Sequence, residues 1–123
     1  MDAPDRDLYA QAVSVAVNAY APYSNFHVGA AVRARDGRVF LGVNVENAAY
    51  PLGVCAEKSA LARAVADGCR RGDLEVIAIT ASPCGGCRQW LHELGLDRVT
   101  YARGNGEVVT TTPADMLPDI FEL

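Results

Sequence analysis

The chain begins with a stretch in which apolar residues recur at helical spacing, from Asp5 to about Tyr20. The apolar positions are Leu8, Ala12, Val15 and Ala19. This spacing predicts a helix that packs one face against a hydrophobic core. An aspartate near its start, Asp5 or Asp7, is suited to cap it, and Pro22 should end it.

Five other segments have the composition of β-strands. They are Val28–Arg35, Arg38–Val45, Leu74–Thr80, Val99–Ala102 and Val108–Thr111. The dipeptide Asp36-Gly37 between the first two favours the tight turn of a β-hairpin. Leu74–Thr80 is a continuous apolar run, which is typical of a strand buried on both faces.

Two more helices are predicted, from Cys55 to about Asp67 and from roughly Gly85 to Leu94, each followed by a glycine that can end it. Pro51–Gly53 forms a turn before the first of them, and Pro113 starts a terminal helical turn. Three main helices around five strands favour an α/β fold with helix–sheet–helix layering. The pattern leaves the order of the strands open.

Composition and charge restrict the function. A chain of 123 residues with 50% hydrophobic content suits a single domain spanning residues 1–123. No run of 18 apolar residues predicts a membrane helix, and the start lacks the features of a signal peptide, so we expect a cytoplasmic protein. The net charge of -4 argues against a nucleic-acid partner and favours a small neutral substrate.

The cysteines bring in specific chemistry. Three of the four fall in two motifs, Cys55-Ala56-Glu57 and Pro-Cys-Gly-Gly-Cys, which contains Cys84 and Cys87. A structural zinc site closes with four protein ligands, whereas a catalytic one stops at three and leaves a place for water. Glu57 is too close to Cys55 to be a comfortable co-ligand, but it can reach such a water as general acid and base. The motifs therefore predict a zinc-dependent hydrolase.

Two further properties of the cysteines bear on this prediction. Cys55 and Cys84 fall at predicted helix starts, where unpaired N–H groups and the helix dipole should lower a thiol pKa. Cys84 and Cys87 are spaced to lie on one helix face. Cys69 belongs to neither motif and is expected to be a plain free thiol. The competing hypothesis is a closed structural zinc site with Cys69 as the fourth ligand.

The motifs resemble those of zinc deaminases, specifically the short type of the cytidine deaminase family whose zinc ligands are all cysteine. The matching segments are Tyr23–Ala31, Asn44–Asn47, Cys55–Glu57 and Pro83–Gln89. The resemblance implies a mixed five-stranded sheet and one Zn²⁺ per chain, held by the three motif cysteines. It also implies hydrolytic deamination of cytidine and 2'-deoxycytidine in pyrimidine salvage, with Glu57 moving protons between the water, the cytosine ring and the departing ammonia.

The same resemblance implies roles for other residues. Asn44 and Glu46 are two apart at a strand end, so both project from one face, and the resemblance assigns them to the ribose. The substrate-binding residues that it implies are Phe26, Asn44, Glu46, Tyr50, Ala56 and Phe121. Considered alone, Phe26 is more typical of a core residue. Because the family's C-terminal aromatic enters a neighbouring subunit, the resemblance implies a homotetramer with shared active sites.

The chain departs from the family at a few positions. Lys58 stands where the family usually has arginine, Gly53 stands where threonine or serine is common, and Ala49–Pro51 replaces Ser-Tyr-Gly. We expect Lys58 to donate to the thiolate of Cys84 or Cys87, and Gln89 to lie near the site. These departures leave open a modified cytosine nucleoside such as blasticidin S as the substrate. Two functions of another class stay open as well, a non-enzymatic zinc module and a nucleic-acid editing deaminase.

Overall fold

A computed structural model describes residues 1–123. Its elements, in chain order, are α1 (Ala3–Val15), the 3₁₀ turn η1 (Ala16–Asn18), β1 (Gly29–Ala34), β2 (Val39–Val43), the 3₁₀ turn η2 (Tyr50–Leu52), α2 (Ala56–Ala66), β3 (Leu74–Ile79), α3 (Gly85–Glu93), β4 (Arg98–Ala102), β5 (Val108–Thr111) and α4 (Pro113–Met116). Every predicted helix and strand is present. None of the helices is long and apolar enough to cross a membrane.

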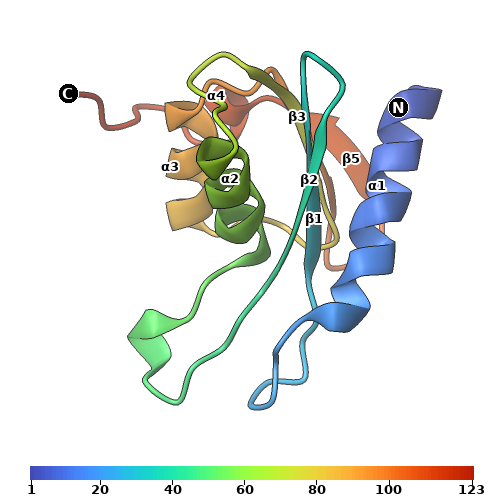
Figure 1. Ribbon diagram of the computed structural model, residues 1–123, viewed down its shortest axis with the longest axis vertical. Coiled ribbons are helices and arrows are strands. Elements are labelled where there is room, and N and C mark those ends of the chain that lie inside the picture. Colours follow the sequence, from blue (N-terminus) through green and yellow to red (C-terminus); the bar gives the residue numbers. More distant parts are fainter.

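The five strands form one mixed sheet in the order β2-β1-β3-β4-β5. β3 and β4 are parallel, and the other neighbouring pairs are antiparallel. α1 covers one face of the sheet, while α2 and α3 lie against the other (Figure 1). This is the expected three-layer helix–sheet–helix sandwich with a mixed five-stranded sheet. The central position of β3 between β1 and β4 explains why its sequence is apolar on both faces.

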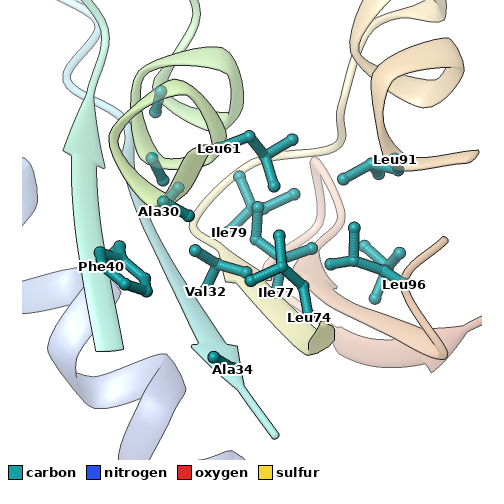
Figure 2. Close-up of a cluster of buried hydrophobic side chains, with 14 of the residues drawn as sticks. Ala30, Val32, Ala34, Phe40, Leu61, Leu74, Ile77, Ile79, Leu91 and Leu96 are labelled. Carbon is teal, nitrogen blue, oxygen red and sulfur yellow. The ribbon is translucent and has the colours of Figure 1, made fainter. Parts of the chain in front are cut away.

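Each face of the sheet has its own core. The larger cluster lies between the sheet and the pair α2 and α3, and Figure 2 shows Val32, Ile77 and Ile79 of the sheet meeting Leu61 of α2. The smaller cluster includes Leu8 and Ala12 of α1. Both layers therefore hold the sheet, and the starts of α2 and α3 are fixed against it.

The first helix differs from the prediction at both ends. Its N-cap is Asp2, whose side chain accepts from the backbone N–H of Asp5 at 2.9 Å, so the predicted cap at Asp5 or Asp7 is wrong. Asp5 is instead buried and accepts hydrogen bonds from Arg98 and Arg33. The α-helix ends at Val15 and continues as η1 to Asn18, so it ends before Pro22, and Tyr20 beyond it forms a bridge with Val45.

Gly42 lets α2 approach β2 at backbone distance. A Cβ at this position would lie 2.3 Å from the backbone N of Ala60 and 2.6 Å from the carbonyl oxygen of Ala56. Both contacts are with backbone atoms, which cannot rotate away as a flexible side chain would. Since Ala56 lies between Cys55 and Glu57, the same contact determines where the start of α2 stands.

The substitution Gly42→Ala should therefore lower stability and disturb metal binding together. Overpacking of a filled core costs about 1–3 kcal/mol, and a backbone clash belongs at the upper end. Urea unfolding measures the loss, and zinc content per chain measures the displacement of Cys55. Gly104→Ala is the matched control, because a Cβ there meets nothing within 4 Å. Equal stability of the two variants would contradict the close approach.

Two long loops extend beyond the sheet at the end where α2 begins (Figure 1). One connects η1 to β1, and the other connects β2 to α2 through η2. They touch through the bridges that Val45 makes with Tyr20 and Val54. The marked C-terminus lies toward the opposite end of the long axis (Figure 1). The candidate site is built where these loops meet the helix starts.

Candidate active site

The three motif cysteines come together at the starts of two neighbouring helices. Cys55 is the N-cap of α2, Cys84 is the N-cap of α3, and Cys87 lies in the first turn of α3. Their sulfur atoms all lie within 4.8 Å of one another. The fold thus brings together two motifs that are far apart along the chain, as predicted.

This sulfur cluster fits zinc. Tetrahedral coordination with Zn–S bonds of about 2.3 Å places sulfurs about 3.8 Å apart, so small side-chain adjustments are enough to bind the ion. The group of possible metal ligands contains three cysteines and no fourth His, Cys, Asp or Glu. Three protein ligands and one open position are the signature of a catalytic zinc site.

Cys69 has a different environment. It is a free thiol in the larger core, 1% exposed, with its sulfur 3.5 Å from a guanidinium nitrogen of Arg38. It does not belong to the metal-ligand group. The hypothesis of a closed four-cysteine site is therefore wrong, and Cys69 is the plain free thiol that the sequence predicts.

The three thiols have different pKa values. Burial raises the pKa of Cys84, but hydrogen bonds from the N–H and the thiol of Cys87, from the N–H of Gly86 and from the thiol of Cys55 together outweigh this and bring it below the usual value. At Cys55 and Cys87 burial dominates and raises the pKa, and at Cys87 the nearby charge of Glu57 adds to the effect. The prediction that a helix start lowers the thiol pKa is thus confirmed for Cys84 and wrong for Cys55. Zinc binding must release the protons that these thiols hold.

Glu57 is a carboxyl group built into the wall of the same site. It lies in the first turn of α2 and is only 4% exposed. Burial raises its pKa, while a hydrogen bond from the Cys87 thiol and the positive charge of Lys58 oppose the shift. A buried carboxyl group beside the sulfurs is placed as a general acid and base requires.

Lys58 lies near the start of α3, although it does not make the predicted hydrogen bond to a sulfur. A Cβ on Gly86 would lie 3.7 Å from the Lys58 ammonium nitrogen and 3.9 Å from the Cys84 sulfur, so both groups flank the start of α3. Among the hydrogen bonds of the structure, none joins Lys58 to a sulfur. The expected direct bond is therefore not formed, but Lys58 is a half-buried cation close to the start of α3.

A cavity of about 670 Å³ opens beside the metal site between the two loops. Its lining residues are Tyr23, Ser24, Val45, Glu46, Asn47, Ala48, Tyr50, Pro51, Gly53, Val54 and Cys55. Glu46 and Cys55 thus face one cavity, as a substrate held near the metal requires. Tyr50, with its side chain 90% exposed, stands at the wall of the cavity.

Glu46 and Asn44 also hold the first loop in place. The Glu46 carboxylate accepts from the N–H groups of Tyr23 and Ser24, at 2.9 and 3.1 Å, and from the Ser24 hydroxyl. The Ser24 hydrogen bond is the main reason that the pKa of Glu46 lies below its usual range. Ser24 received no role from the sequence, although it lies in a motif, because a contact across 22 residues leaves no local pattern.

Asn44 also bonds to the backbone of the first loop, near the start of β1. Its amide oxygen accepts from the N–H of Val28 at 2.8 Å, and its amide nitrogen donates to the carbonyl oxygen of Phe26 at 2.8 Å. Phe26 is 61% exposed, so the interpretation of this residue as core is wrong. Asn44 fixes the loop backbone in a way that leaves the aromatic ring free for another contact.

The remaining predicted residues occupy distinct places. Ala56 is buried against β2 at the start of α2. Gln89 lies on α3 and bonds to the backbone of Phe121, whose side chain is 68% exposed. Phe121 does not line the cavity, and its contacts are with Gln89.

Comparison with known proteins agrees with this geometry. The family model for the cytidine and deoxycytidylate deaminase zinc-binding region matches residues 2–103. The chain is 42% identical to the cytidine deaminase of Sporosarcina psychrophila over 120 residues, covering 93% of this chain and 88% of that one. It is 40% identical to the enzyme of Halalkalibacterium halodurans, covering 93% of this chain and 91% of that one.

Solved structures give the same result. The fold superimposes on the crystal structure of cytidine deaminase from Burkholderia pseudomallei with a TM-score of 0.89, at 44% identity, covering 98% of this chain and 100% of that one. For the Mycobacterium tuberculosis enzyme the TM-score is 0.84 at 37% identity, covering 99% and 100%. With a matching family model, a matching fold and a three-cysteine zinc cluster beside a buried glutamate, this chain belongs to the cytidine and deoxycytidylate deaminase family.

Proposed function

We propose that this protein is a zinc-dependent deaminase that converts cytidine and 2'-deoxycytidine, with water, into uridine and 2'-deoxyuridine plus ammonia. The observation that carries the proposal is the cluster of Cys55, Cys84 and Cys87 beside Glu57. A reaction of this kind serves pyrimidine salvage, because it returns the base of a nucleoside to the uracil form. The metal is Zn²⁺, one ion per chain, held by the three thiolates.

The chemical work of the chain centres on Glu57. Bound zinc would supply a polarised water as the nucleophile near neutral pH. Glu57 accepts a proton and donates it to N3 of the cytosine ring, which makes C4 electrophilic. The oxygen of the water adds to C4, and Glu57 then takes the remaining proton from that oxygen and delivers it to the amino nitrogen, so that the C4–N bond breaks and ammonia leaves. Its burial keeps competing water away from the carboxylate during these transfers.

The other residues hold the nucleoside. Phe26 packs its exposed ring on the base, and Ala56 meets the base through the backbone at the start of α2. Asn44 and Glu46 receive the sugar hydroxyls with the hydrogen-bonding capacity that their loop contacts leave free. Tyr50 forms part of the cavity wall. The absence of a phosphate-binding cation among the lining residues of the cavity supports a nucleoside substrate.

An ultraviolet assay tests this proposal directly. Purified zinc-loaded protein is given cytidine, 2'-deoxycytidine, free cytosine and blasticidin S in parallel, and loss of the cytosine absorbance is followed. We expect turnover of both nucleosides and poor turnover of free cytosine, which lacks the sugar's binding energy. Turnover of blasticidin S alone would overturn the substrate assignment, and turnover of none would overturn the enzymatic proposal.

The sugar contact leads to a prediction for Glu46. The substitution Glu46→Gln keeps an oxygen for the loop N–H groups but removes the charge offered to the ribose. Hydrogen bonds to charged groups contribute about 1.5–3 kcal/mol. We therefore expect kcat/KM for cytidine to fall by about 10- to 100-fold, with a smaller loss for free cytosine, both measured in the ultraviolet assay.

Ser24→Ala is the control for this prediction, because it weakens the same loop contact and leaves the carboxylate in place. If Glu46 acts on the sugar, Ser24→Ala should cost less on cytidine than Glu46→Gln does. Equal losses for cytidine and cytosine in both variants would assign Glu46 to the loop alone.

Lys58 offers a second prediction. Three thiolates around Zn²⁺ leave a net charge of about -1, and the Lys58 ammonium is the cation placed to offset it. Lys58→Gln should lower kcat by about 10- to 100-fold, if a charge-assisted interaction is lost at the transition state. It should also speed zinc loss to a chelator. Lys58→Arg should retain activity, and unchanged chelation and rate in Lys58→Gln would assign the lysine to solvent.

We further propose that the active protein is a homotetramer with shared active sites. Tyr50 and Phe121 expose large apolar side chains that a monomer leaves in water, and such patches are typical of protein–protein interfaces. Light scattering after gel filtration tests the assembly.

We also propose a single catalytic domain over residues 1–123 and a cytoplasmic location, where reducing conditions keep the three ligand thiols available.

A further inference from the structure

Residues 81–83 lead to Cys84 without any backbone–backbone hydrogen bond. The approach to Cys55 is different, because it follows Val54, whose N–H and carbonyl oxygen both pair with Val45 at 2.9 Å. Backbone polar groups that leave water need partners, and Pro83 is buried. Another group must therefore hold the segment that brings Cys84 to the site.

Arg88 supplies the missing hydrogen bonds. Its guanidinium Nε donates to the carbonyl oxygen of Pro83 at 3.0 Å, and a terminal nitrogen donates to the Ser82 hydroxyl at 3.5 Å. Among the hydrogen bonds of the structure, only those of Arg88 reach residues 81–83. The backbone N–H of Arg88 also donates to the carbonyl oxygen of Cys84 at 3.0 Å. One residue thus fixes the peptide groups on both sides of a zinc ligand.

The same guanidinium connects this turn to α4, which lies beside α3 (Figure 1). The other terminal nitrogen of Arg88 donates to the carbonyl oxygen of Met116 at 2.9 Å. Met116 is the last residue of α4, and it packs into the larger core. The start of α4 is capped by Thr112, whose hydroxyl accepts from the N–H of Asp115 at 3.1 Å. The planar guanidinium therefore bridges two backbone carbonyl groups, and the second of them is anchored in the core.

We infer that Arg88 is a positioning residue of the metal site: it anchors the peptide before Cys84 to the end of α4 and so determines where that sulfur lies among the three. The inference deepens the proposed function, on which it rests for the bound zinc. Cys84 is the exposed member of the three ligands, so packing restrains it least and hydrogen bonds matter most there. Partners that orient metal ligands typically change metal affinity by about 10- to 100-fold.

Zinc affinity, measured by competition with a chromogenic chelator, tests the inference without any substrate. Arg88→Gln should bind zinc about 10- to 100-fold more weakly than the wild type. Arg88→Lys should not restore the affinity, because lysine keeps the charge but lacks the planar fork. Affinity restored by lysine would mean that charge alone matters, and it would overturn the inference.

Arg71→Gln is the matched control. The Arg71 guanidinium donates to the carbonyl oxygen of Glu93 at 2.8 Å, at the opposite end of α3 from the sulfurs. Its loss should loosen that helix end and leave zinc affinity unchanged. Bound Co²⁺ adds a spectroscopic test, because its visible absorption depends on the geometry of its ligands. Arg88→Gln should shift this absorption and Arg71→Gln should not, whereas wild-type affinity and spectrum in Arg88→Gln would overturn the inference.

A double-mutant cycle tests the connection through α4. Thr112→Ala removes the cap of α4, so zinc affinity should fall severalfold where Arg88 is present. In an Arg88→Gln background the same substitution should have no further effect. Equal losses in both backgrounds would mean that α4 acts on the site without Arg88, and they would overturn the bridge. Inactivity on cytidine together with the expected zinc affinities would refute the proposed function and still support the inference.

Discussion

Glu57→Gln should reduce kcat for cytidine by at least about 10²–10⁴-fold, the contribution typical of a positioned general acid or base. The loss belongs at the upper end because Glu57 is asked to move protons more than once in each turnover. Glutamine has nearly the same shape, so it fills the same buried position without opening a cavity. The measurement is single-turnover conversion of cytidine at saturating protein, which separates chemistry from binding.

Three further measurements make this result specific. Zinc content should stay at one ion per chain, because Glu57 is not one of the three sulfur ligands. Cytidine binding should largely survive, since the contacts to the sugar lie elsewhere. Glu93→Gln, an exposed glutamate on α3, should have wild-type turnover. A Glu57→Gln protein with near-normal kcat would end the proton-shuttle mechanism.

The elements of the fold were predictable because they are encoded locally. Gly68 and Gly95 end their helices with positive φ, as the sequence indicates, and Asp36-Gly37 joins β1 to β2. The order of the strands was not predictable, because apolar runs of similar length can pair in many ways. Asp5 shows the same limit on a smaller scale: its acidity suggested a cap, but its partners Arg98 and Arg33 lie far along the chain.

The chemistry of the site was also predictable only in part. Cysteine spacing predicted the zinc ligands, because each motif fixes a sulfur relative to a helix start. The thiol pKa values were predicted correctly only for Cys84. There, hydrogen bonds from N–H and thiol groups together outweigh burial, whereas burial dominates at Cys55. Burial depends on how the whole core packs, so a local sequence motif does not predict it.

The surroundings of Phe26 and Lys58, near the predicted metal site, also depend on packing. The exposure of Phe26 follows from hydrogen bonds that Asn44 makes to the loop backbone, and these join residues 16 to 18 positions apart. Lys58 approaches the sulfurs because α2 and α3 start side by side, which only the packed sheet determines. The resemblance to a family named both residues, but packing decides what each of them contacts.

Cys84→Ala should abolish both zinc binding and deamination. Two thiolates cannot complete the three-ligand set, and a catalytic zinc site has no spare protein ligand to substitute. Because a metal that binds only the folded protein adds its binding energy to folding, the melting temperature should also fall and should no longer respond to added zinc. Metal analysis after gel filtration, cytidine turnover and thermal unfolding with and without a chelator measure the three effects.

Cys69→Ser is the matched cysteine control, and it separates the ligand role from a general loss of a thiol. Cys69 is as buried as Cys87, yet its sulfur faces Arg38 in the core and not the metal cluster. Serine there places a hydroxyl in an apolar core, so some stability should be lost, while zinc stays at one ion per chain and turnover stays near wild type. Loss of zinc in Cys69→Ser, or retention of zinc in Cys84→Ala, would contradict the three-cysteine site. Chelator treatment of the wild type should lower its melting temperature to that of Cys84→Ala, because both proteins then lack the same metal contribution.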